Sequence, residues 1–447
     1  MTGVHGPVRS ARILDEARRY SRRGFLATVV TVAGGVVLSA CTTNVGGGSG
    51  ASGSAAPAGN AGGKITISHW YHQYGEAGTQ EAVLRYAKEY TAKNPNVQVN
   101  VTWVPGDYAT KSAAALLTSD APDVFEGSPT LAMVKANQIA ALDDIMTAEV
   151  KADFDPKDIE AATINGKIYA VKMVDDTAMI YYRKSTLDAA GVKPPTTMAE
   201  VIAAAQKLTK GNTKGLYLGN DGGISALLTL LPFSNKAQFI KDDKILFDTP
   251  QTVAAYKSLA DLNATGSLLL GVPTDWFDPD SFTQGLAAMQ WCGLWAMPAI
   301  KKALNDDFGI IPWPAFDANG TPATFRGGWG EMVGAQSKNL QAAKDYVKYL
   351  WIASKETQTD FSLSYGFHVP PRKSVAATAT QLTTGPAKEA VDIVNKYGTI
   401  LPPTWDAAMT TALTDALSNV VKNKADAQSE VTKAAQKCQD ELKRVLA

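Results

Sequence analysis

The chain alternates between two hydrophobic periods from Lys64 onward. Residues 65–70 have the pattern of a short buried strand, residues 79–93 place apolar side chains at helical spacing, and residues 97–103 alternate apolar and polar positions. This order predicts a strand, a helix and a second strand, as in a βαβ unit. Because such units give mixed, mostly parallel sheets with helices on both faces, we expect an α/β fold. The same pattern predicts further strands at 123–125, 168–171 and 178–182 and a helix at 113–118.

Two later helical regions carry signals for their own start. Thr197 and Glu200 form a capping-box motif, so a helix should begin at Met198. The prolines at 402–403 introduce a long C-terminal helical region that should pack on the rest of the fold. Its apolar stripe repeats at spacings of four and three residues and consists of Val431, Ala435, Cys438, Leu442 and Val445.

Cys292 and Cys438 both lie in apolar surroundings, and we expect Cys438 to fill the core. An exported protein would meet an oxidising environment, in which a disulfide between the two can form. No spacing pattern supports such a bridge, so the pairing stays open.

The first forty residues carry the pattern of an export signal. Arg22 and Arg23 precede an apolar run at 27–38, which is too short to cross about 30 Å of hydrocarbon. A paired arginine at this place is typical of twin-arginine export. The segment from Leu38 to Cys41 resembles the bacterial lipobox, whose cysteine is diacylated, with palmitate as a typical chain. We therefore expect residues 1–40 to be a removed lipoprotein signal peptide and Cys41 to anchor the mature chain to the outer face of the cytoplasmic membrane.

The rest of the composition fits a folded exported protein. Residues 41–63 hold the lipidated cysteine and an uncharged linker rich in Gly, Ser and Ala, which as a flexible coil spans roughly 25 Å. Residues 64–447 exceed what one core usually supports, so two lobes are expected. Removal of 1–40 leaves 37 basic and 41 acidic residues. This mildly acidic balance, without a basic patch, argues against nucleic-acid binding. The absence of a long heptad run favours a monomer.

Enzyme and cofactor signatures are sparse. The sequence has no Gly-x-Ser-x-Gly elbow, no phosphate-binding Gly-rich loop, no Cys-x-x-Cys and no His-Glu-x-x-His, so we expect no cofactor and no catalysis. His69 and His72 could in principle ligate a metal. Their spacing on a strand, however, points the two rings to different sides. Two histidines that form hydrogen bonds at the mouth of a cleft are the favoured interpretation.

The nine tryptophans are more informative. Trp103 and Trp351 fit the core. The others are expected at the ends of elements, beside Gly, Pro or acids such as Asp275 and Asp278. A flat apolar face next to carboxylates is what sugar recognition needs. The set consists of Trp70, Trp276, Trp291, Trp295, Trp313, Trp329 and Trp405.

A series of short blocks resembles family 1 extracellular solute-binding proteins, the sugar-binding components of ATP-binding-cassette (ABC) importers. The resemblance runs from about Lys64 to the C-terminus, and the order of the blocks carries it. The blocks are Pro122 to Phe125, Asn165 to Val171, Asp175 to Thr177, Ile180 to Lys184, Leu187 to Val192, Pro194 to Thr197, Phe282 to Pro298, Gly309 to Pro314 and Gly327 to Gly330.

The resemblance implies a site between two lobes. Asp176, with Asp175 as its competitor, occupies the position of an acid that binds ligand hydroxyls, and Trp295 and Trp405 match stacking tryptophans. Maltose-binding members place an aromatic near Glu126, so the acid here departs from the maltodextrin pattern. The other ligand-binding residues that we expect are Trp70, Tyr71, Gln73, Asn220, Trp276, Trp329 and Glu331.

The fold that the resemblance implies is a two-lobed, type II periplasmic-binding-protein fold. We expect residues 64–174 with 329–376 to form one lobe and residues 177–327 with 377–447 to form the other. Closure of the lobes on a small-molecule sugar, of two or more units, would create the form that docks on a membrane permease. Two alternatives remain open, namely a phosphodiester, polyamine or peptide ligand in the same fold, and a membrane-anchored glycoside hydrolase using Asp175 and Glu331.

Overall fold

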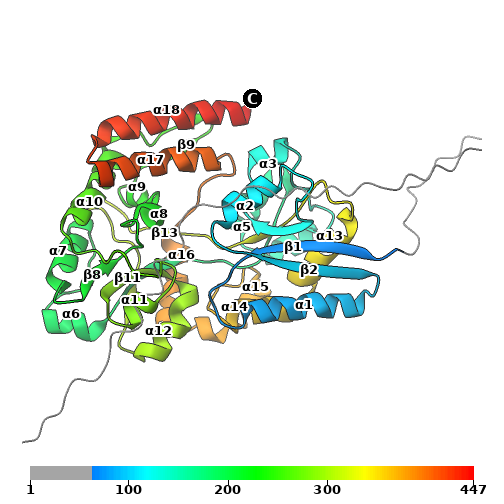
Figure 1. Cartoon of the computed structure of the whole chain (residues 1–447), viewed down its shortest axis with the longest axis horizontal. Coiled ribbons are helices and arrows are strands. Elements are labelled where there is room, and N and C mark those ends of the chain that lie inside the picture. The colour runs from blue at the N-terminus through cyan, green and yellow to red at the C-terminus, as the bar shows by residue number, and fades with distance from the viewer. Residues whose placement is uncertain (1–62) are drawn as a thin grey trace, which may run out of the picture. The chain divides into compact units, whose positions relative to one another are not determined.

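The computed structural model describes residues 63–447, and these fold as one unit with two larger sheets and three two-stranded ones (Figure 1). The expected signal peptide, the arginines 22–23 and the lipidation site Cys41 lie outside the described residues. Within 63–447 no helix combines the length and the apolar character needed to cross a membrane.

The first sheet has five strands in the order β2-β1-β3-β14-β6. β1 lies parallel to both β2 and β3, which confirms the predicted βαβ unit, and α1 (Thr79–Lys93) has the predicted bounds. β14 arrives from far along the chain and pairs antiparallel with β3 and β6. The strands are β1 Ile65–His72, β2 Val97–Val104, β3 Val124–Gly127, β6 Val171–Lys172 and β14 Gly330–Val333.

The second sheet has four strands in the order β12-β7-β11-β8. Only β8 and β11 are parallel, whereas β7 runs antiparallel to both β11 and β12. The sheets are thus mixed, as expected, but contain more antiparallel pairing than the alternation predicted. β7 begins where β11 ends, with Ala178 opposite Gly293, so the two strands run in opposite directions. The strands are β7 Ala178–Tyr182, β8 Lys214–Tyr217, β11 Ala287–Gly293 and β12 Gly309–Ile311.

Each sheet has its own hydrophobic core, which defines a first and a second lobe. The core of the first lobe gathers residues of β1, β3, α1 and α13 (Leu340–Lys348). The core of the second gathers residues of β7, β11, α7 (Met198–Leu208) and the C-terminal helices α17 (Ala407–Asn423) and α18 (Ala427–Leu446). α7 begins at Met198 with both hydrogen bonds of the capping box in place, as predicted.

Two predicted elements have different bounds. α2 spans Tyr108–Ala115 rather than 113–118, because the Asp107 carboxylate caps it and accepts the Thr110 N–H at 3.1 Å. The predicted strand 168–171 is divided between β5 and β6. The remaining elements are α3 Leu131–Lys135, α4 Ala148–Asp153, α5 Pro156–Ala162, β4 Thr163–Ile164, β5 Lys167–Ile168, α6 Lys184–Ala190, α8 Ile224–Leu227, α9 Leu230–Ser234, β9 Ile240–Lys241, β10 Lys244–Ile245, α10 Pro250–Ala264, α11 Asp280–Thr283, α12 Met297–Leu304, β13 Thr324–Phe325, α14 Lys355–Leu363, α15 Lys373–Ala376, α16 Gly385–Tyr397 and β15 Gly398–Thr399.

Several side chains proposed from sequence fill the core. Trp351 is fully buried, as expected, but so are Trp291 and Trp313, which were expected at element boundaries. Trp291 lies within β11 and contacts Trp313 edge-on at a ring distance of 6.2 Å. Cys438 fills the second core as predicted, and both it and Cys292 are buried free thiols, so they do not form the disulfide that the sequence left open.

Candidate ligand-binding cleft

The two lobes are joined by three chain segments that lie side by side. Asp175 exchanges both backbone hydrogen bonds with Val369, and the Gly327 N–H donates to the Asp176 carbonyl at 2.8 Å. Gly328 has a φ of +86°, and a Cβ there would lie 2.1 Å from the Val174 carbonyl oxygen. Only glycine fits so close a backbone approach. Short segments held in this way are suited to act as a hinge.

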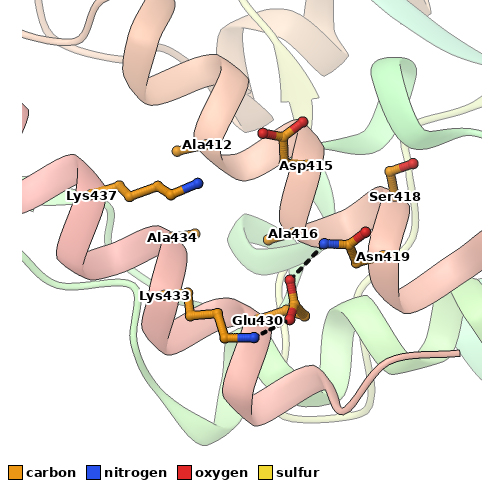
Figure 2. Close-up of a pocket in the computed structure, with 9 residues that line it drawn as sticks. All are labelled: Ala412, Asp415, Ala416, Ser418, Asn419, Glu430, Lys433, Ala434 and Lys437. Atoms are coloured by element: carbon orange, nitrogen blue, oxygen red, sulfur yellow. Dashed lines mark hydrogen bonds and ion pairs between the residues drawn. The ribbon is translucent and has the colours of Figure 1, made fainter. Parts of the chain in front are cut away.

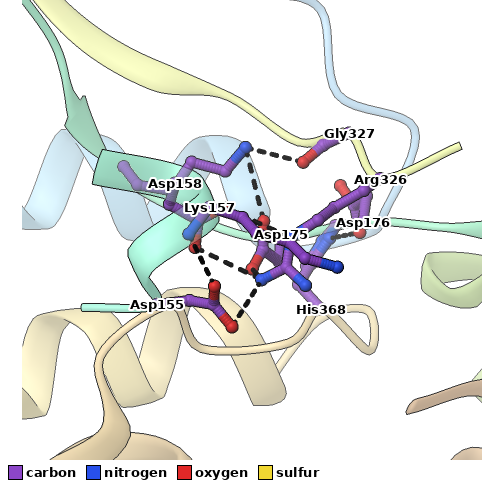
Figure 3. Close-up of polar contacts among 9 residues, drawn as sticks. Asp155, Lys157, Asp158, Asp175, Asp176, Arg326, Gly327 and His368 are labelled. Carbon is purple, nitrogen blue, oxygen red and sulfur yellow. Dashed lines mark hydrogen bonds and ion pairs between the residues drawn. The ribbon is translucent and has the colours of Figure 1, made fainter. Parts of the chain in front are cut away.

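Asp175 faces a cluster of charged side chains (Figure 3). Its carboxylate accepts a hydrogen bond from Arg326 at 2.9 Å and lies 3.3 Å from the Lys172 ammonium. Arg326 also pairs with Asp155 at 3.1 Å and with Asp158 at 3.4 Å. Burial, and then the charge of Asp175, raise the pKa of Asp158 to about 7. Both cations, Lys172 and Arg326, are therefore paired with aspartate carboxylates.

Asp176 faces the other way, as expected for neighbours in an extended chain. Its carboxylate lies 2.7 Å from Nδ1 of His368, whose Nε2 lies 3.5 Å from Glu76 (Figure 3 shows the Asp176 pair). The two carboxylates outweigh the burial of His368 and raise its pKa to about 10. His368 in turn lowers the pKa of Glu76, although burial alone would raise it.

The pH dependence of stability should reveal this histidine. The pKa of His368 rises from an ordinary 6.5 to about 10 in the fold, so its stabilising charge is complete below about pH 6.5. It is lost progressively as the pH rises through about 10. We expect the melting temperature of the wild type to fall between pH 7 and 10. The melting temperature of His368→Gln should change less over the same range. Parallel profiles for the two proteins would contradict the pairing.

A cavity of about 330 Å³ lies beside the crossover segments and is lined by both lobes. The first lobe contributes Lys172 and the segment from Gly127 to Thr130. The second contributes Phe233, Phe325 and Trp405, and Arg326 lies on the crossover between them. Of the predicted ligand-binding residues, only Trp405 lines this cavity. Its ring is 7% exposed and packs edge-on against Phe239, so it also belongs to the second core.

Two predicted tryptophans of the second lobe form an aromatic group. Trp276 and Trp295 are half-buried, with ring centroids 6.0 Å apart. Trp276 also contacts Phe325, a wall residue of the cavity, at 6.5 Å. Asn220 is exposed, but its side-chain amide forms four hydrogen bonds with the backbone of residues 271–274. It therefore positions the segment that leads into Trp276.

Three predicted residues lie inside the first lobe. Tyr71 is 0% exposed and its hydroxyl has no partner among the described residues. Glu126 accepts hydrogen bonds from the His72 backbone N–H and the Tyr74 hydroxyl and also contacts the His72 ring. Glu331 is 0% exposed and lies 2.9 Å from both the His69 ring and the Trp351 indole N–H. These side chains belong to β1, β3 and β14, the three inner strands of the first sheet, and hold the first lobe together.

The predicted residues at the end of β1 differ in exposure. Gln73 is exposed, Trp70 is half-buried against the first core, and half-buried Trp329 contacts the His72 ring at 4.9 Å. His69 and His72 bind different acids, so their rings are not arranged for a shared metal. The expectation that both lie at a cleft mouth is wrong for His69, which is 0% exposed. Across residues 63–447 no group of three side chains is arranged to hold a metal ion.

A second hollow of about 210 Å³ lies between α17 and α18 (Figure 2). Glu430 there accepts hydrogen bonds from Asn419 and Lys433, both at 2.7 Å. The lining contains no aromatic side chain. Three of its polar side chains already bind each other and no ring is available for stacking, which makes it a poorer sugar site than the cavity at the crossover.

Sequence reasoning missed the side chains that complete the crossover. Neither His368, Asp158 nor Arg326 belongs to the ligand-binding set that the sequence predicts. Asp176 and His368 are 192 positions apart, and no local pattern signals such a contact. Gly327-Gly328, at the start of the last block, was the one signal in the sequence that a close backbone approach lies there.

The fold and the cavity define a two-lobed solute-binding protein. Residues 85–390 match the family of bacterial extracellular solute-binding proteins, and the chain belongs to that family. An uncharacterised ABC transporter extracellular-binding protein of Pyrococcus horikoshii is 26% identical over 347 residues, which cover 70% of this chain and 73% of that protein. The multiple sugar-binding protein of Streptococcus mutans is 24% identical over 312 residues, covering 65% and 72%.

The fold is also shared with solved structures. A solute-binding protein of an ABC transporter from Thermotoga lettingae, bound with α-D-tagatose, matches with a TM-score of 0.73 at 19% identity. The match covers 85% of this chain and 100% of that one. The predicted two-lobed α/β fold and membership of a solute-binding family are thereby confirmed.

Proposed function

We propose that this protein is the receptor of an ABC importer that captures a sugar of two or more units and delivers it to a membrane permease. The observation that carries the proposal is the cavity at the crossover, lined by both lobes and flanked by tryptophans of the second lobe. A pocket with apolar and aromatic walls and a few fixed polar groups is the usual form of a small-molecule site. The sugar-binding name of the Streptococcus mutans relative agrees with it.

Closure of the lobes is the proposed signal to the permease. We take residues 64–174 with 329–376 and residues 177–327 with 377–447 as the two lobes. A ligand that touches both lobes stabilises the closed arrangement by its differential affinity for the two states. The crossover ladder of Asp175, Asp176 and Gly327 would flex during this motion, with glycine at 328 keeping the segments close.

A neutral ligand fits the charges better than an anion. Lys172 and Arg326 are the cations nearest the cavity, and both already pair with aspartates. An incoming phosphodiester would have to compete with Asp155, Asp158 and Asp175. We therefore favour a sugar, with Trp295, Trp276 and Trp405 as the stacking residues and the Asp176 carboxylate as an acceptor for hydroxyls. Asp175 would act by holding Arg326 and Lys172 in place. Gln73 and Trp329 would approach the ligand from the first lobe.

A receptor role is also favoured over glycoside hydrolysis. The hydrolase alternative needs Asp175 and Glu331 to face the same substrate. Glu331 is instead fully buried, with both carboxylate oxygens bound by His69 and Trp351. Five of the predicted residues would then position their neighbours rather than touch the ligand, namely Glu126, Glu331, Tyr71, Trp70 and Asn220.

Membership of an extracellular solute-binding family indicates an exported protein. We propose that export follows the twin-arginine route and that a lipid on Cys41 keeps the mature protein at the membrane. Cys41→Ala should therefore move the protein from the membrane fraction to the medium. Sedimentation of the variant with membranes, together with continued incorporation of labelled fatty acid, would contradict the anchor.

A thermal-shift screen tests the proposed function. Mono-, di- and trisaccharides are compared with phosphodiesters, polyamines and peptides. A ligand at about one hundred times its dissociation constant should add about 2.7 kcal/mol of stability. Shifts from glycans, with the glycan recovered unchanged after hours, are expected. Shifts only from charged compounds would overturn the substrate, and release of shorter sugars would favour the hydrolase.

A further inference from the structure

The second lobe exposes an aromatic side chain, Phe277, that belongs to none of the sequence motifs. Phe277 is 55% exposed, and its ring lies 5.9 Å from that of Trp276 in an edge-on arrangement. Trp276 in turn lies 6.0 Å from Trp295. We call Trp276, Phe277 and Trp295 the outer aromatic patch. A large exposed aromatic ring adds little to a core, so its place beside two half-buried tryptophans needs a reason.

Hydrogen bonds hold the segment that carries this patch. Asn220 bonds the backbone of residues 271–274, and the Tyr217 hydroxyl donates to the Thr274 carbonyl at 2.5 Å. Fully buried Gln290 donates to the carbonyls of Trp276 at 3.2 Å and Asp278 at 2.7 Å. Such bracing fixes the rings in place before any ligand arrives, which lowers the entropic cost of binding.

A hydrogen bond links two residues of the outer aromatic patch, and a ring contact links the patch to the cavity wall. The Trp295 indole N–H donates to the Phe277 carbonyl at 3.0 Å, so the two residues are fixed relative to each other. Trp276 contacts Phe325, which lines the cavity. A line of aromatic rings thus leads from the cavity wall through Trp276 to exposed Phe277. Asp275 and Asp278 flank the rings in sequence, with carboxylates that can accept sugar hydroxyls.

We propose that Phe277 forms an outer subsite that stacks on a sugar ring lying beyond the cavity. The proposal rests on the proposed function and deepens it, because it assigns the residue that would bind a sugar unit lying outside the cavity. The cavity of about 330 Å³ is at the small end of ligand sites, so the units of a longer glycan must extend out of it. The exposed face of Phe277 offers the apolar C–H surface of a pyranose a place to lie.

Calorimetric titration with glycans of increasing length tests the subsite. The probes are α-1,4-glucans, β-1,4-glucans and β-1,4-mannans of one to five units, and the proteins are the wild type, Phe277→Ala and Phe277→Tyr. The control is Leu270→Ala, because Leu270 is 52% exposed in the same region but is aliphatic. We expect the wild type to gain affinity with length in the series it binds. Phe277→Ala should lose about threefold to tenfold for the longer glycans only.

The other two variants and the short glycans show whether a loss of affinity comes from the aromatic ring of Phe277. Phe277→Tyr should restore most of the affinity for long glycans, and Leu270→Ala should match the wild type at every length. An equal loss for all lengths, or no loss for any, would overturn the outer subsite while leaving the proposed function in place. If the wild type binds no glycan at all, the proposed function fails and the subsite falls with it.

Discussion

Replacing Glu331 by alanine should lower the free energy of unfolding by about 2 to 6 kcal/mol, because two buried groups would each lose a hydrogen-bond partner. Glu331 is 0% exposed, and its two oxygens lie 2.9 Å from the His69 ring and the Trp351 indole N–H. Without the carboxylate, both groups would stay buried and lose their partner. Urea unfolding of the wild type and the variant measures the loss.

Glu331→Gln is the matched control. It keeps the shape and one acceptor oxygen, so it should lose clearly less stability than the alanine variant. The folded fraction of both variants should bind sugar with the affinity of the wild type, because Glu331 lies within the first lobe. A variant that keeps its stability and loses sugar binding would place Glu331 in the ligand site, as the resemblance implied.

Trp405 and Trp295 should respond very differently to alanine. Trp405 packs within the second core between Phe239 and Phe247, so Trp405→Ala should cost about 3 to 5 kcal/mol of stability. It also lines the cavity and should weaken sugar binding. Half-buried Trp295 should cost little stability, and Trp295→Ala should reduce binding energy by about 1 to 3 kcal/mol.

Measuring stability and affinity on the same samples separates the two roles. The comparison needs only urea unfolding and one titration per variant with the sugar found in the screen. If Trp295→Ala binds that sugar as tightly as the wild type, Trp295 is a structural side chain and the stacking role is wrong. If Trp405→Ala unfolds like the wild type, the burial of that ring adds nothing to the core.

Local patterns predicted the regular elements well. The bounds of α1 and β7 and the start of α7 at Met198 agree with the structure, because capping and hydrophobic period are set by residues close together in sequence. Antiparallel β14 could not be seen in the same way. Its four residues pair with β3 and β6, more than 150 positions earlier, and no nearby signal marks the partner.

The candidate site was predicted less completely, for the same physical reason. A resemblance can point to Asp175 and Asp176, but what each carboxylate binds depends on side chains brought by other segments. Arg326 and His368 take opposite sides of the crossover and turn two adjacent acids into parts of two separate networks. Likewise, the exposure of Phe277 and the burial of Trp291 depend on tertiary packing that an aromatic residue's neighbours in sequence do not reveal.

The crossover segments and the cavity together suit a mechanism of hinged closure. Three crossover segments connect two separately packed lobes, and a cavity beside them is lined by both. A sugar held there would link the lobes, and the paired charges of Asp175 and Asp176 would keep the crossover ordered in the absence of ligand. The permease would then distinguish a loaded receptor from an empty one by the arrangement of the lobes.

Small-angle X-ray scattering of the purified protein, with and without the sugar identified by the screen, tests this claim most directly. With the sugar at saturating concentration, confirmed by titration of the same sample, the radius of gyration should fall and the scattering profile should become that of a more closed pair of lobes. Identical profiles with and without a saturating sugar would contradict closure around the ligand as the basis of function.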